Sequence, residues 1–486
     1  MKILVLNPPF LNKFSRTSRS PAVSKGGCVY YPIWLAYATG LLEQEGHEIK
    51  LIDAPSKGQS YEEVEKIASE FQPELIAIDT VIASFNNDAK TSEKLRKKFP
   101  KSFIVMVGTH PSALPEECLK RAKAIDAVAR AEYDFILRDL AKALQEKKPL
   151  TTVKGITYRN TNSENEFISN PEMPLITPEE LDEFPFVSEV YKKHLNVKDY
   201  FYPSVMYPQI TIMTGRGCNY RCTFCMWPQT LTKRPYRPRS VENVVQEFEW
   251  IKKNFPEVKE IMIEDDTLTQ DKERTIELCK ELVKRKINLP WSCNSRADID
   301  LETMQWMKKA KSRLMCVGFE SGVQEILNNI KKGTKIEKIR QFMKDSKKAK
   351  ILVHGCFMMG NKGETKESIQ ETVKFAKELD PDTAQFFPIM VYPGTEAFNW
   401  AKENNFLTTE DWSKWLLETG EHNTIVSTDK LSAEELVKEC DKARRSFYMR
   451  PSYIAKKLWQ GLTHPNELPR LMKSGKTFFK YLFNLS

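Results

Sequence analysis

The strongest constraint on the fold is a repeated alternation of short apolar runs with segments of helical spacing. Six apolar runs follow one another after residue 208, and each is separated from the next by a stretch that can hold a helix: QITIMTG, EIMIEDD, PWSCNSR, RLMCVGFES, ILVHGCFMMG and TAQFFPIMV. Consecutive strand–helix units build a parallel sheet that binds ligands at the carboxyl ends of its strands. The alternation therefore predicts a partial (β/α)6 TIM-like barrel over residues 206–410.

The first 145 residues show the same alternation on a smaller scale. Their apolar runs are KILVLN, EIKLIDA, ELIAIDTV, SFIVMVG and AIDAVAR. This order predicts an α/β, doubly wound, Rossmann-like domain at residues 1–145. The G-x-G-x-x-G fingerprint of dinucleotide sites is missing after the first run, where NPPF stands, so the sequence does not support nicotinamide binding.

Two further segments complete the expected organisation. Residues 146–205 contain a small hairpin signal, TTVKGITYRN, and a proline-dotted run, and they are expected to form a linker between the domains. Residues 411–486 turn helical, basic and aromatic and are expected to form a C-terminal extension.

The composition points to a cytoplasmic protein. The N-terminus, MKILVLNPPF, is apolar for too few residues to be a signal peptide and is expected to be a buried first strand. No apolar run approaches the ~18–20 residues that cross a bilayer. The 10 cysteines are therefore expected to be free thiols or metal ligands in a reducing compartment.

The net charge of +9 is concentrated in the C-terminal extension, where cations alternate with aromatic side chains. This pattern is typical of peripheral contact with an anionic membrane, here the inner membrane surface. The alternative is a solvated face on helices packed against the barrel. Nucleic acid is not expected as a partner, because no nucleic-acid motif accompanies the charge. The aromatic residues concerned are Phe447, Tyr448, Trp459, Phe478, Phe479 and Phe483.

Three cysteines stand directly after the first predicted barrel strand, in GRGCNYRCTFCMWPQ. Cys218, Cys222 and Cys225 have the spacing C-x3-C-x2-C. Structural zinc would need a fourth ligand, and the nearest candidates are His194, well upstream, and Cys279, inside a predicted helix. Three thiolates on one loop suit a 4Fe–4S cluster with one iron open to another ligand.

At this loop the sequence resembles the radical S-adenosylmethionine (SAM) superfamily, whose hallmark is this spacing with an aromatic residue before the third cysteine. The resemblance implies a 4Fe–4S cluster held by the three cysteines, SAM on the open iron, and a flavodoxin- or ferredoxin-type electron donor. It also implies that residues at the later strand ends contact the cofactors. These cofactor-binding candidates are Phe224, Asp265, Asp266, Asn294, Arg296, Glu320, Ser321, Gly355, Phe357 and Gly360.

The N-terminal domain resembles the cobalamin-binding domain that precedes many radical SAM barrels. The resemblance rests on GTHPSALPEE and ARAEYDF. The D-x-H-x-x-G signature of domains whose histidine ligates cobalt is missing, because Gly108 stands two residues before His110 where that signature has Asp. A turn or helix-cap role is therefore expected for His110, and cobalamin binding is left open.

A longer resemblance, through MWPQT, EDDT and GFESG, is to the hopanoid-biosynthesis radical SAM enzymes. It implies a lipid or lipid-linked sugar substrate and ring contraction of the bacteriohopanetetrol glucosamine head group to a cyclitol ether. The alternative is a cobalamin-dependent radical SAM methyltransferase acting on a lipid or another small molecule. A cluster-bearing electron carrier is disfavoured, since it needs no nucleotide-binding loops. The sequence names no catalytic acid or base and does not indicate the oligomeric state.

Overall fold

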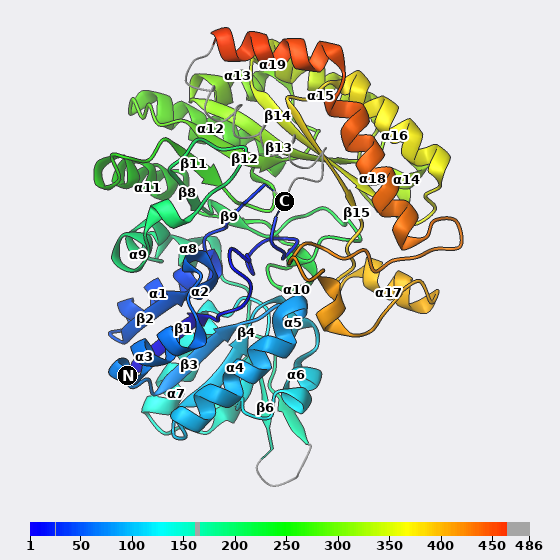
Figure 1. Cartoon of the computed structure of the whole chain (residues 1–486). Coiled ribbons are helices and arrows are strands. Elements are labelled where there is room, and N and C mark those ends of the chain that lie inside the picture. Colours follow the sequence, from blue (N-terminus) through cyan, green and yellow to red (C-terminus); the bar gives the residue numbers. More distant parts are fainter. Residues whose placement is uncertain (25, 161–165, 464–486) are drawn as a thin grey trace.

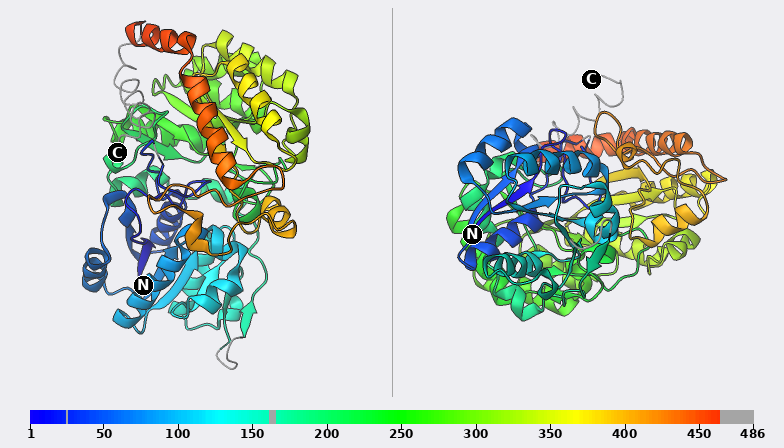
Figure 2. Two further views of the ribbon diagram at one scale, coloured as in Figure 1. Left: turned by 45° about the vertical axis from the view of Figure 1, so that its right-hand side comes forward. Right: turned by 90° about the horizontal axis from the view of Figure 1, so that it is seen from below.

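The computed structural model describes residues 1–24, 26–160 and 166–463. Two α/β units are stacked in Figure 1, with the N-terminal unit below and the barrel above. The C-terminal helices lie along one edge of the barrel (Figure 2). This arrangement confirms the predicted fold class.

The N-terminal sheet has the order β2-β1-β3-β4-β5-β6-β7, and its first five strands are parallel. Strand β1 pairs with β2 on one side and with β3 on the other, which is the doubly wound pattern that the sequence predicted. Apolar side chains of these strands are buried between two helix layers. The strands are β1 (Lys2–Asn7), β2 (Glu48–Asp53), β3 (Leu75–Asp79), β4 (Phe103–Val107), β5 (Ala127–Ala129), β6 (Ile156–Arg159) and β7 (Phe167–Ser169).

The hairpin that we placed in the linker belongs to this first sheet. Strand β6 pairs antiparallel with β5, with Ala127 opposite Tyr158, and β7 then pairs with β6. The edge of β5 would otherwise present unpaired backbone groups, and the hairpin covers it. The rest of the predicted linker, residues 170–205, packs between the units and contains two short helices, α8 (Pro178–Asp182) and α9 (Val187–His194).

The barrel is an open sheet of six parallel strands in the order β15-β14-β13-β12-β11-β8. Each of the six predicted apolar runs forms one strand. The helices between them lie outside the sheet (Figure 1), so the other face of the strands points to the barrel interior, which we call the lumen. The strands are β8 (Gln209–Ile212), β11 (Glu260–Ile263), β12 (Trp291–Ser295), β13 (Ser312–Glu320), β14 (Leu352–Met359) and β15 (Thr383–Pro388); a short ribbon, β9 (Gly215–Arg216) with β10 (Arg237–Pro238), stands beside them.

Several helices begin at a serine or threonine that caps their first turn. Ser60, Thr365 and Ser432 each accept a backbone hydrogen bond at a helix start, which satisfies a donor that the first turn leaves free. The remaining helices are α1 (Ile33–Gln44), α2 (Ala54–Lys57), α3 (Tyr61–Phe71), α4 (Phe85–Lys98), α5 (Thr109–Ala113), α6 (Pro115–Arg121), α7 (Asp134–Gln145), α10 (Trp227–Thr230), α11 (Val241–Asn254), α12 (Lys272–Lys284), α13 (Leu301–Lys309), α14 (Gln324–Asn329), α15 (Ile336–Ala349), α16 (Lys366–Leu379), α17 (Glu396–Glu403), α18 (Ala433–Tyr448) and α19 (Pro451–Thr463).

The chain between β1 and α1 leaves the first domain and reaches the barrel. Val29 exchanges backbone hydrogen bonds with Phe201, and the Val23 amide donates to the carbonyl of Gly420. The segment is the dark blue trace that rises toward the barrel in Figure 1. Periodicity did not predict this path, because the segment contains neither a strand nor a helix. These contacts place the segment beside Phe201 of the linker and Gly420 of the C-terminal extension.

The C-terminal extension packs on the barrel more closely than the sequence suggested. Phe447 is fully buried, and the Tyr448 hydroxyl donates to the carbonyl of Ala384 on β15. Arg450 and Lys456 both pair with Asp380 at the end of α16. Phe447 and Tyr448 are therefore part of the packing of α18 against the sheet, and do not form the membrane-facing surface that we predicted.

Only part of the predicted aromatic surface is exposed. Trp459 on α19 exposes 68% of its area, and Leu458 and Leu462 are exposed beside it. Phe478, Phe479 and Phe483 lie outside the described residues. None of the helices within residues 1–24, 26–160 and 166–463 is long and apolar enough to span a membrane.

Candidate active site

The three cysteines of the C-x3-C-x2-C motif lie on the loop after β8. A Cβ at Gly217, which has φ of +86°, would stand 2.0 Å from the carbonyl oxygen of Pro235, so the loop needs glycine just before Cys218. Gln229 on the following helix donates to the carbonyl of Cys225 at 2.7 Å. These contacts hold the loop across the carboxyl end of the barrel.

The spacing of the three cysteine sulfurs shows whether the loop suits an iron–sulfur cluster or a single zinc ion. The three sulfurs of Cys218, Cys222 and Cys225 do not all lie within 4.8 Å of one another in the described chain. One tetrahedral ion would need closer sulfurs, since each Zn–S bond is about 2.3 Å. The wider triangle fits a 4Fe–4S cluster.

The surroundings of Cys222 favour a thiolate. A hydrogen bond from Cys225 and the charges of Lys332 and Arg296 lower the pKa of Cys222 to about 6, although burial opposes them. Thiolates are the form of cysteine that binds iron. The loop is therefore prepared to ligate a metal cluster.

Arg296 connects the loop to the end of β12. Its Nη1 donates to the Cys222 sulfur at 3.7 Å, its guanidinium lies 3.6 Å from the ring centre of Tyr220, and its Nε donates to Asp298 at 3.1 Å. Asn294 lies on the same strand, and its amide donates to the carbonyl of Asp265 at 3.2 Å. Arg296 thus stands beside the cluster loop, and Asn294 contacts the chain directly after β11.

Glu320 and Lys332 form a buried pair at the end of β13. Lys332 Nζ donates to Glu320 Oε1 at 2.9 Å, and both side chains are over 90% buried. Glu320 has φ of +65°, a strained conformation for a residue with a side chain. The predicted aromatic, Phe224, lies 5.9 Å from the Lys332 ammonium. This pair faces the cluster loop, and Lys332 was not among the predicted site residues.

The three acidic residues after β11, Glu264, Asp265 and Asp266, make different contacts. Asp265 accepts hydrogen bonds from the backbone amide and the hydroxyl of Thr214, both at 2.6 Å, so its carboxylate fastens two strands together. Asp266 accepts from the hydroxyl of Thr232 at 3.0 Å. Glu264 has one carboxylate oxygen, Oε2, with no hydrogen-bond partner in the described part of the chain. Burial raises the pKa of Asp266 and of Glu264 above the ordinary range.

Arg19 approaches this acidic run from the N-terminal segment. It donates to a carboxylate oxygen of Glu264 and to the carbonyls of Glu264 and Asp265, the latter two at 2.9 Å. Its guanidinium also lies 4.1 Å from the ring centre of Trp227, which follows the cluster loop. Sequence reasoning missed Arg19, because no local pattern links an irregular segment to a strand so distant in the chain.

Four of the predicted cofactor-binding residues make packing contacts. The Ser321 hydroxyl hydrogen-bonds Thr372 on α16 at 3.1 Å. Phe357 is fully buried and stacks on Phe386, and a Cβ at Gly355 would lie 2.9 Å from Phe319. A Cβ at Gly360 would meet α18. Ser321 and Gly360 thus lie against helices α16 and α18, and Gly355 and Phe357 pack among side chains of the neighbouring strands.

A second group of buried polar atoms lies at the carboxyl ends of the N-terminal strands. His110, in the first turn of α5, exposes only 2% of its area. Both its ring nitrogens lack a hydrogen-bond partner among the described residues. Burial lowers the pKa of His110 to about 4, so the ring is neutral. Trp34 Nε1 and the Tyr133 hydroxyl are also buried without a partner in the described chain. Buried polar atoms normally find partners, so these atoms indicate a polar ligand at the sheet edge.

The two groups lie next to each other. Helix α5, which carries His110, contacts α10, which follows the cluster loop directly. The rings of Trp34 and Trp227 meet edge to face at 5.2 Å. A buried ion pair joins the units at the same place, with Arg216 Nη1 2.7 Å from a carboxylate oxygen of Asp134. The ligand edge of the first sheet therefore faces the cluster end of the barrel.

Both sites fit the groups that the resemblance implies. The three thiols, with cationic Arg296 and Lys332 beside them, suit an anionic cluster. The unpartnered atoms at His110, Trp34 and Tyr133 suit a large ligand rich in amide groups, such as a corrinoid.

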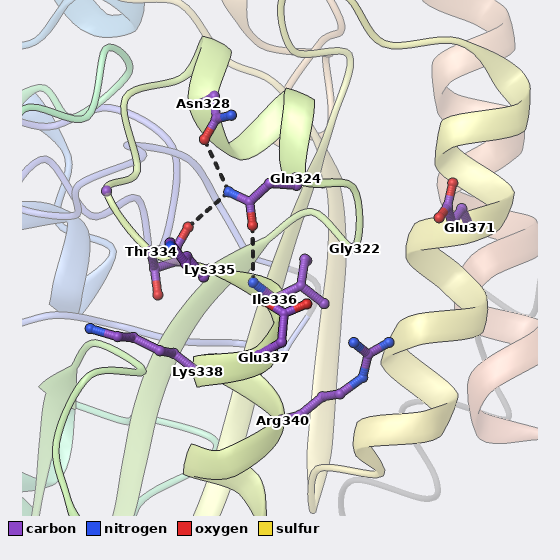
Figure 3. Close-up of a pocket in the computed structure, with 11 residues that line it drawn as sticks. Gly322, Gln324, Asn328, Thr334, Lys335, Ile336, Glu337, Lys338, Arg340 and Glu371 are labelled. Atoms are coloured by element: carbon purple, nitrogen blue, oxygen red, sulfur yellow. Dashed lines mark hydrogen bonds between the residues drawn. The ribbon is translucent and has the colours of Figure 1, made fainter.

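A separate hollow of about 730 Å³ lies on the outer surface, between α14, α15 and α16 (Figure 3). Gln324 crosses it and is hydrogen-bonded to Asn328, Thr334 and Ile336. No predicted cofactor-binding residue lines this hollow. The cluster cysteines and the unpartnered buried polar atoms lie instead at the facing ends of the two sheets.

Family models match both units. The model of the radical SAM superfamily matches residues 212–376, and the model of the B12-binding domain matches residues 19–141. The fold and the cysteine loop together thus define a radical SAM enzyme with a cobalamin-binding domain.

Relatives match over nearly the whole chain. An uncharacterized methyltransferase of Pyrococcus horikoshii is 31% identical and covers 95% of each chain. The cytidylyl-2-hydroxyethylphosphonate methyltransferase of Streptomyces wedmorensis is 26% identical and covers 88% of each. The radical SAM methyltransferase TsrM of Kitasatospora setae, solved with cobalamin and a 4Fe–4S cluster, has the same fold with a TM-score of 0.67 and 16% identity, covering 93% of this chain and 89% of that chain. The chain belongs to the family of cobalamin-dependent radical SAM methyltransferases.

These findings bear on two expectations from the sequence, cobalamin binding and the choice between ring contraction and methyl transfer. The cofactors are a 4Fe–4S cluster, SAM and cobalamin, so cobalamin binding, left open by the sequence, is established by the family. The resemblance to hopanoid-biosynthesis enzymes is not supported, and neither are a lipid substrate and ring contraction. The missing D-x-H-x-x-G signature bears on one cobalt ligand and not on binding of the corrinoid.

Proposed function

We propose that this enzyme transfers a methyl group to a carbon atom of a substrate that binds in the barrel lumen. When bound, the cluster would supply the electron that cleaves one SAM to a 5′-deoxyadenosyl radical, which takes a hydrogen from the substrate carbon and leaves as 5′-deoxyadenosine. The corrinoid would carry to that carbon the methyl group of a second SAM, which is released as S-adenosylhomocysteine. The chain itself must hold the substrate carbon between these two groups and keep water away.

One observation carries this proposal: the contact between α5 and α10 places the ligand edge of the first sheet beside the cluster loop. A methyl group held at that edge needs a short path to a carbon that is activated at the cluster end of the barrel. Two cofactor sites on separate faces could not share one substrate.

The chain's own residues close the space between the sites. Arg19 of the N-terminal segment lies over Trp227 directly after the cluster loop, and the ion pair of Arg216 with Asp134 joins the two units. Their side chains replace water around the reacting groups, which limits the quenching of a radical by solvent.

The proposal is tested by reconstituting the cluster anaerobically, adding hydroxocobalamin, and removing unbound corrinoid by gel filtration. We expect about one cobalt and about four iron atoms per chain, with corrinoid absorbance that stays with the protein. The variant Cys218→Ala/Cys222→Ala/Cys225→Ala is expected to lose iron but keep cobalt. Protein that keeps its iron and retains no corrinoid would contradict the proposal, because no methyl carrier would remain.

A further inference from the structure

Two cysteines and a histidine lie together on the inward face of the barrel, away from the cluster loop. Cys316 on β13 pairs in register with His354 on β14, and Cys356 is two residues further along β14, opposite Gly318. Residues two apart in a strand share a face, so all three side chains point to one side of the sheet. The residues between them, Val317 and Gly355, face the helix layer.

The positions of the ligand atoms suit a single metal ion. One donor atom from each of the three residues lies within 4.8 Å of the other two, and the sulfurs of Cys316 and Cys356 are 4.0 Å apart. Two sulfurs that bind one zinc ion tetrahedrally, at about 2.3 Å each, are about 3.8 Å apart. The observed separation therefore needs almost no adjustment. This contrasts with the three cluster cysteines, whose sulfurs are more widely spaced.

His354 is also held as a metal ligand usually is. Its Nδ1 lies 2.7 Å from the hydroxyl of Thr383 on β15. Histidines that bind metals commonly use the second ring nitrogen to hydrogen-bond a neighbour, which fixes the tautomer and the ring orientation. With Nδ1 held by Thr383, Nε2 is the nitrogen that would bind the ion.

A disulfide is a poorer explanation for the two cysteines. Because Cys356 stands opposite Gly318, Cys316 and Cys356 are diagonal neighbours on paired strands. Neighbouring strands lie about 4.8 Å apart and rise about 3.3 Å per residue, so residues offset by two on paired strands have Cα atoms about 8 Å apart. A disulfide needs a shorter Cα separation, of about 4.4–6.8 Å. The arrangement favours ligation of an ion that bridges the gap.

We propose that Cys316, His354 and Cys356 form a zinc site whose fourth position faces the barrel lumen. Two thiolates and one imidazole in a tetrahedral set are typical of zinc. Binding releases the two thiol protons, and the ion with two thiolates carries no net charge, which suits a half-buried site. A site with three protein ligands keeps one position for water or substrate.

The depth of the site indicates what the ion would do. Cys316 precedes Glu320 by four residues on β13, which at about 3.3 Å per residue places it roughly 13 Å below the strand end. The ion would hold the far end of a substrate through a hydroxyl, amine or carboxylate group, while the reacting carbon lies near the cluster. This role rests on the proposed function, whereas zinc binding itself does not.

Zinc would also protect the radical chemistry. A free thiol is a good hydrogen donor to a carbon radical, because its S–H bond is weak. Two free thiols on the lumen wall would compete with the substrate, and a zinc-bound thiolate has no S–H bond to give. Zinc has no redox chemistry of its own, so it would not consume electrons meant for the cluster.

The test measures zinc and iron in the cluster-loaded enzyme. Protein reconstituted anaerobically is incubated with Zn²⁺, passed over a weak chelating resin, and analysed for metals and by zinc X-ray absorption. We expect about one zinc per chain with two sulfurs at about 2.3 Å and one nitrogen at about 2.0–2.1 Å. The triple alanine variant of the cluster cysteines should keep this zinc, which excludes the cluster loop as its ligand.

Variants of the three residues supply the decisive comparison. Cys316→Ser, Cys356→Ser and His354→Gln should each lower zinc retention at least about tenfold with iron unchanged, since each removes one of three ligands. Cys279→Ala, in the core of α12, is the matched control and should keep zinc. Iron-loaded wild-type protein that retains no zinc would overturn the site, as would variants that bind zinc as the wild type does. Zinc bound as predicted in a protein that methylates no substrate would overturn the proposed function and leave the site standing.

Discussion

Arg19 forms an ion pair with Glu264 at the carboxyl end of β11, although 245 residues separate them in the chain. The pair joins the N-terminal segment to the end of the barrel that carries the cluster loop. The only described cation bonded to the Glu264 carboxylate thus comes from outside the barrel. The barrel end is complete only when the segment between β1 and α1 is in place.

Replacement of Arg19 should shift the pH dependence of SAM cleavage. Burial raises the pKa of Glu264, and the charge of Arg19 lowers it. In Arg19→Met the opposing charge is lost, so the pKa rises further and the carboxylate becomes protonated at a higher pH. We expect the acidic limb of the rate of 5′-deoxyadenosine formation to move to higher pH. Arg19→Lys should restore much of the wild-type profile, and an unchanged limb in Arg19→Met would show that Glu264 does not control it.

The interdomain ion pair should contribute strongly to stability. Arg216 and Asp134 are at least 98% buried, with exposures of 2% and 1%. Arg216→Met leaves the charge of Asp134 buried without its closest partner, which should cost about 3–5 kcal/mol. Thermal unfolding of the cofactor-free protein should show the loss as a lower Tm. The double variant Arg216→Met/Asp134→Leu should recover part of it, and a single variant as stable as the wild type would refute this assignment.

His110 should contact the corrinoid without binding its cobalt. A metal-binding histidine normally hydrogen-bonds a neighbour through its second nitrogen, and His110 has no such partner in the described residues. We expect His110→Phe to weaken cobalamin binding about fivefold, the effect of one lost hydrogen bond. The electron paramagnetic resonance spectrum of the Co(II) form should be the same in both proteins. Nitrogen splitting present in the wild type and absent from the variant would show that His110 is a cobalt ligand.

Asp79 should make the cofactor-free protein less stable as the pH rises. Burial at the end of β3 raises its pKa to about 7, from 3.8. Between those values the folded state binds a proton that the unfolded state has lost, so this group's contribution to folding falls as the pH rises from about 4 to about 7. The free energy of unfolding of Asp79→Asn, measured with urea, should depend less on pH in this window. By pH 7.5 the variant should gain on the order of 2–4 kcal/mol in this free energy relative to the wild type. Equal pH dependence in both proteins would contradict the raised pKa.

The sequence predicted the sheets well because their strands are apolar and short. All six barrel runs, including RLMCVGFES and ILVHGCFMMG, became strands in the predicted order. The cluster cysteines were equally visible, since their ligand spacing lies on one local loop. The sequence pattern was sufficient to predict strands and the cysteine loop, because both depend on residues close together in the chain.

Sequence reasoning failed where contacts are long-range. The predicted cofactor contact of Phe357 rests on its place near a strand end, which does not show that its ring stacks on Phe386 of the neighbouring strand. Arg19 and Lys332 could not be found, because nothing near them in the chain indicates which carboxylate each will meet. Cys316 and His354 did carry a signal, as polar residues on one face of otherwise apolar strands, which alternation along the strand could have revealed.

Product analysis tests the central proposal, that one chain consumes SAM both for a radical and for a methyl group. The reconstituted, cobalamin-loaded enzyme is incubated with SAM and a strong reductant, and nucleoside products are separated by liquid chromatography. We predict both 5′-deoxyadenosine and S-adenosylhomocysteine in the wild type, with 5′-deoxyadenosine absent from Cys218→Ala/Cys222→Ala/Cys225→Ala and S-adenosylhomocysteine dependent on cobalamin. Formation of 5′-deoxyadenosine without any S-adenosylhomocysteine, in protein that holds both cofactors, would contradict methyl transfer.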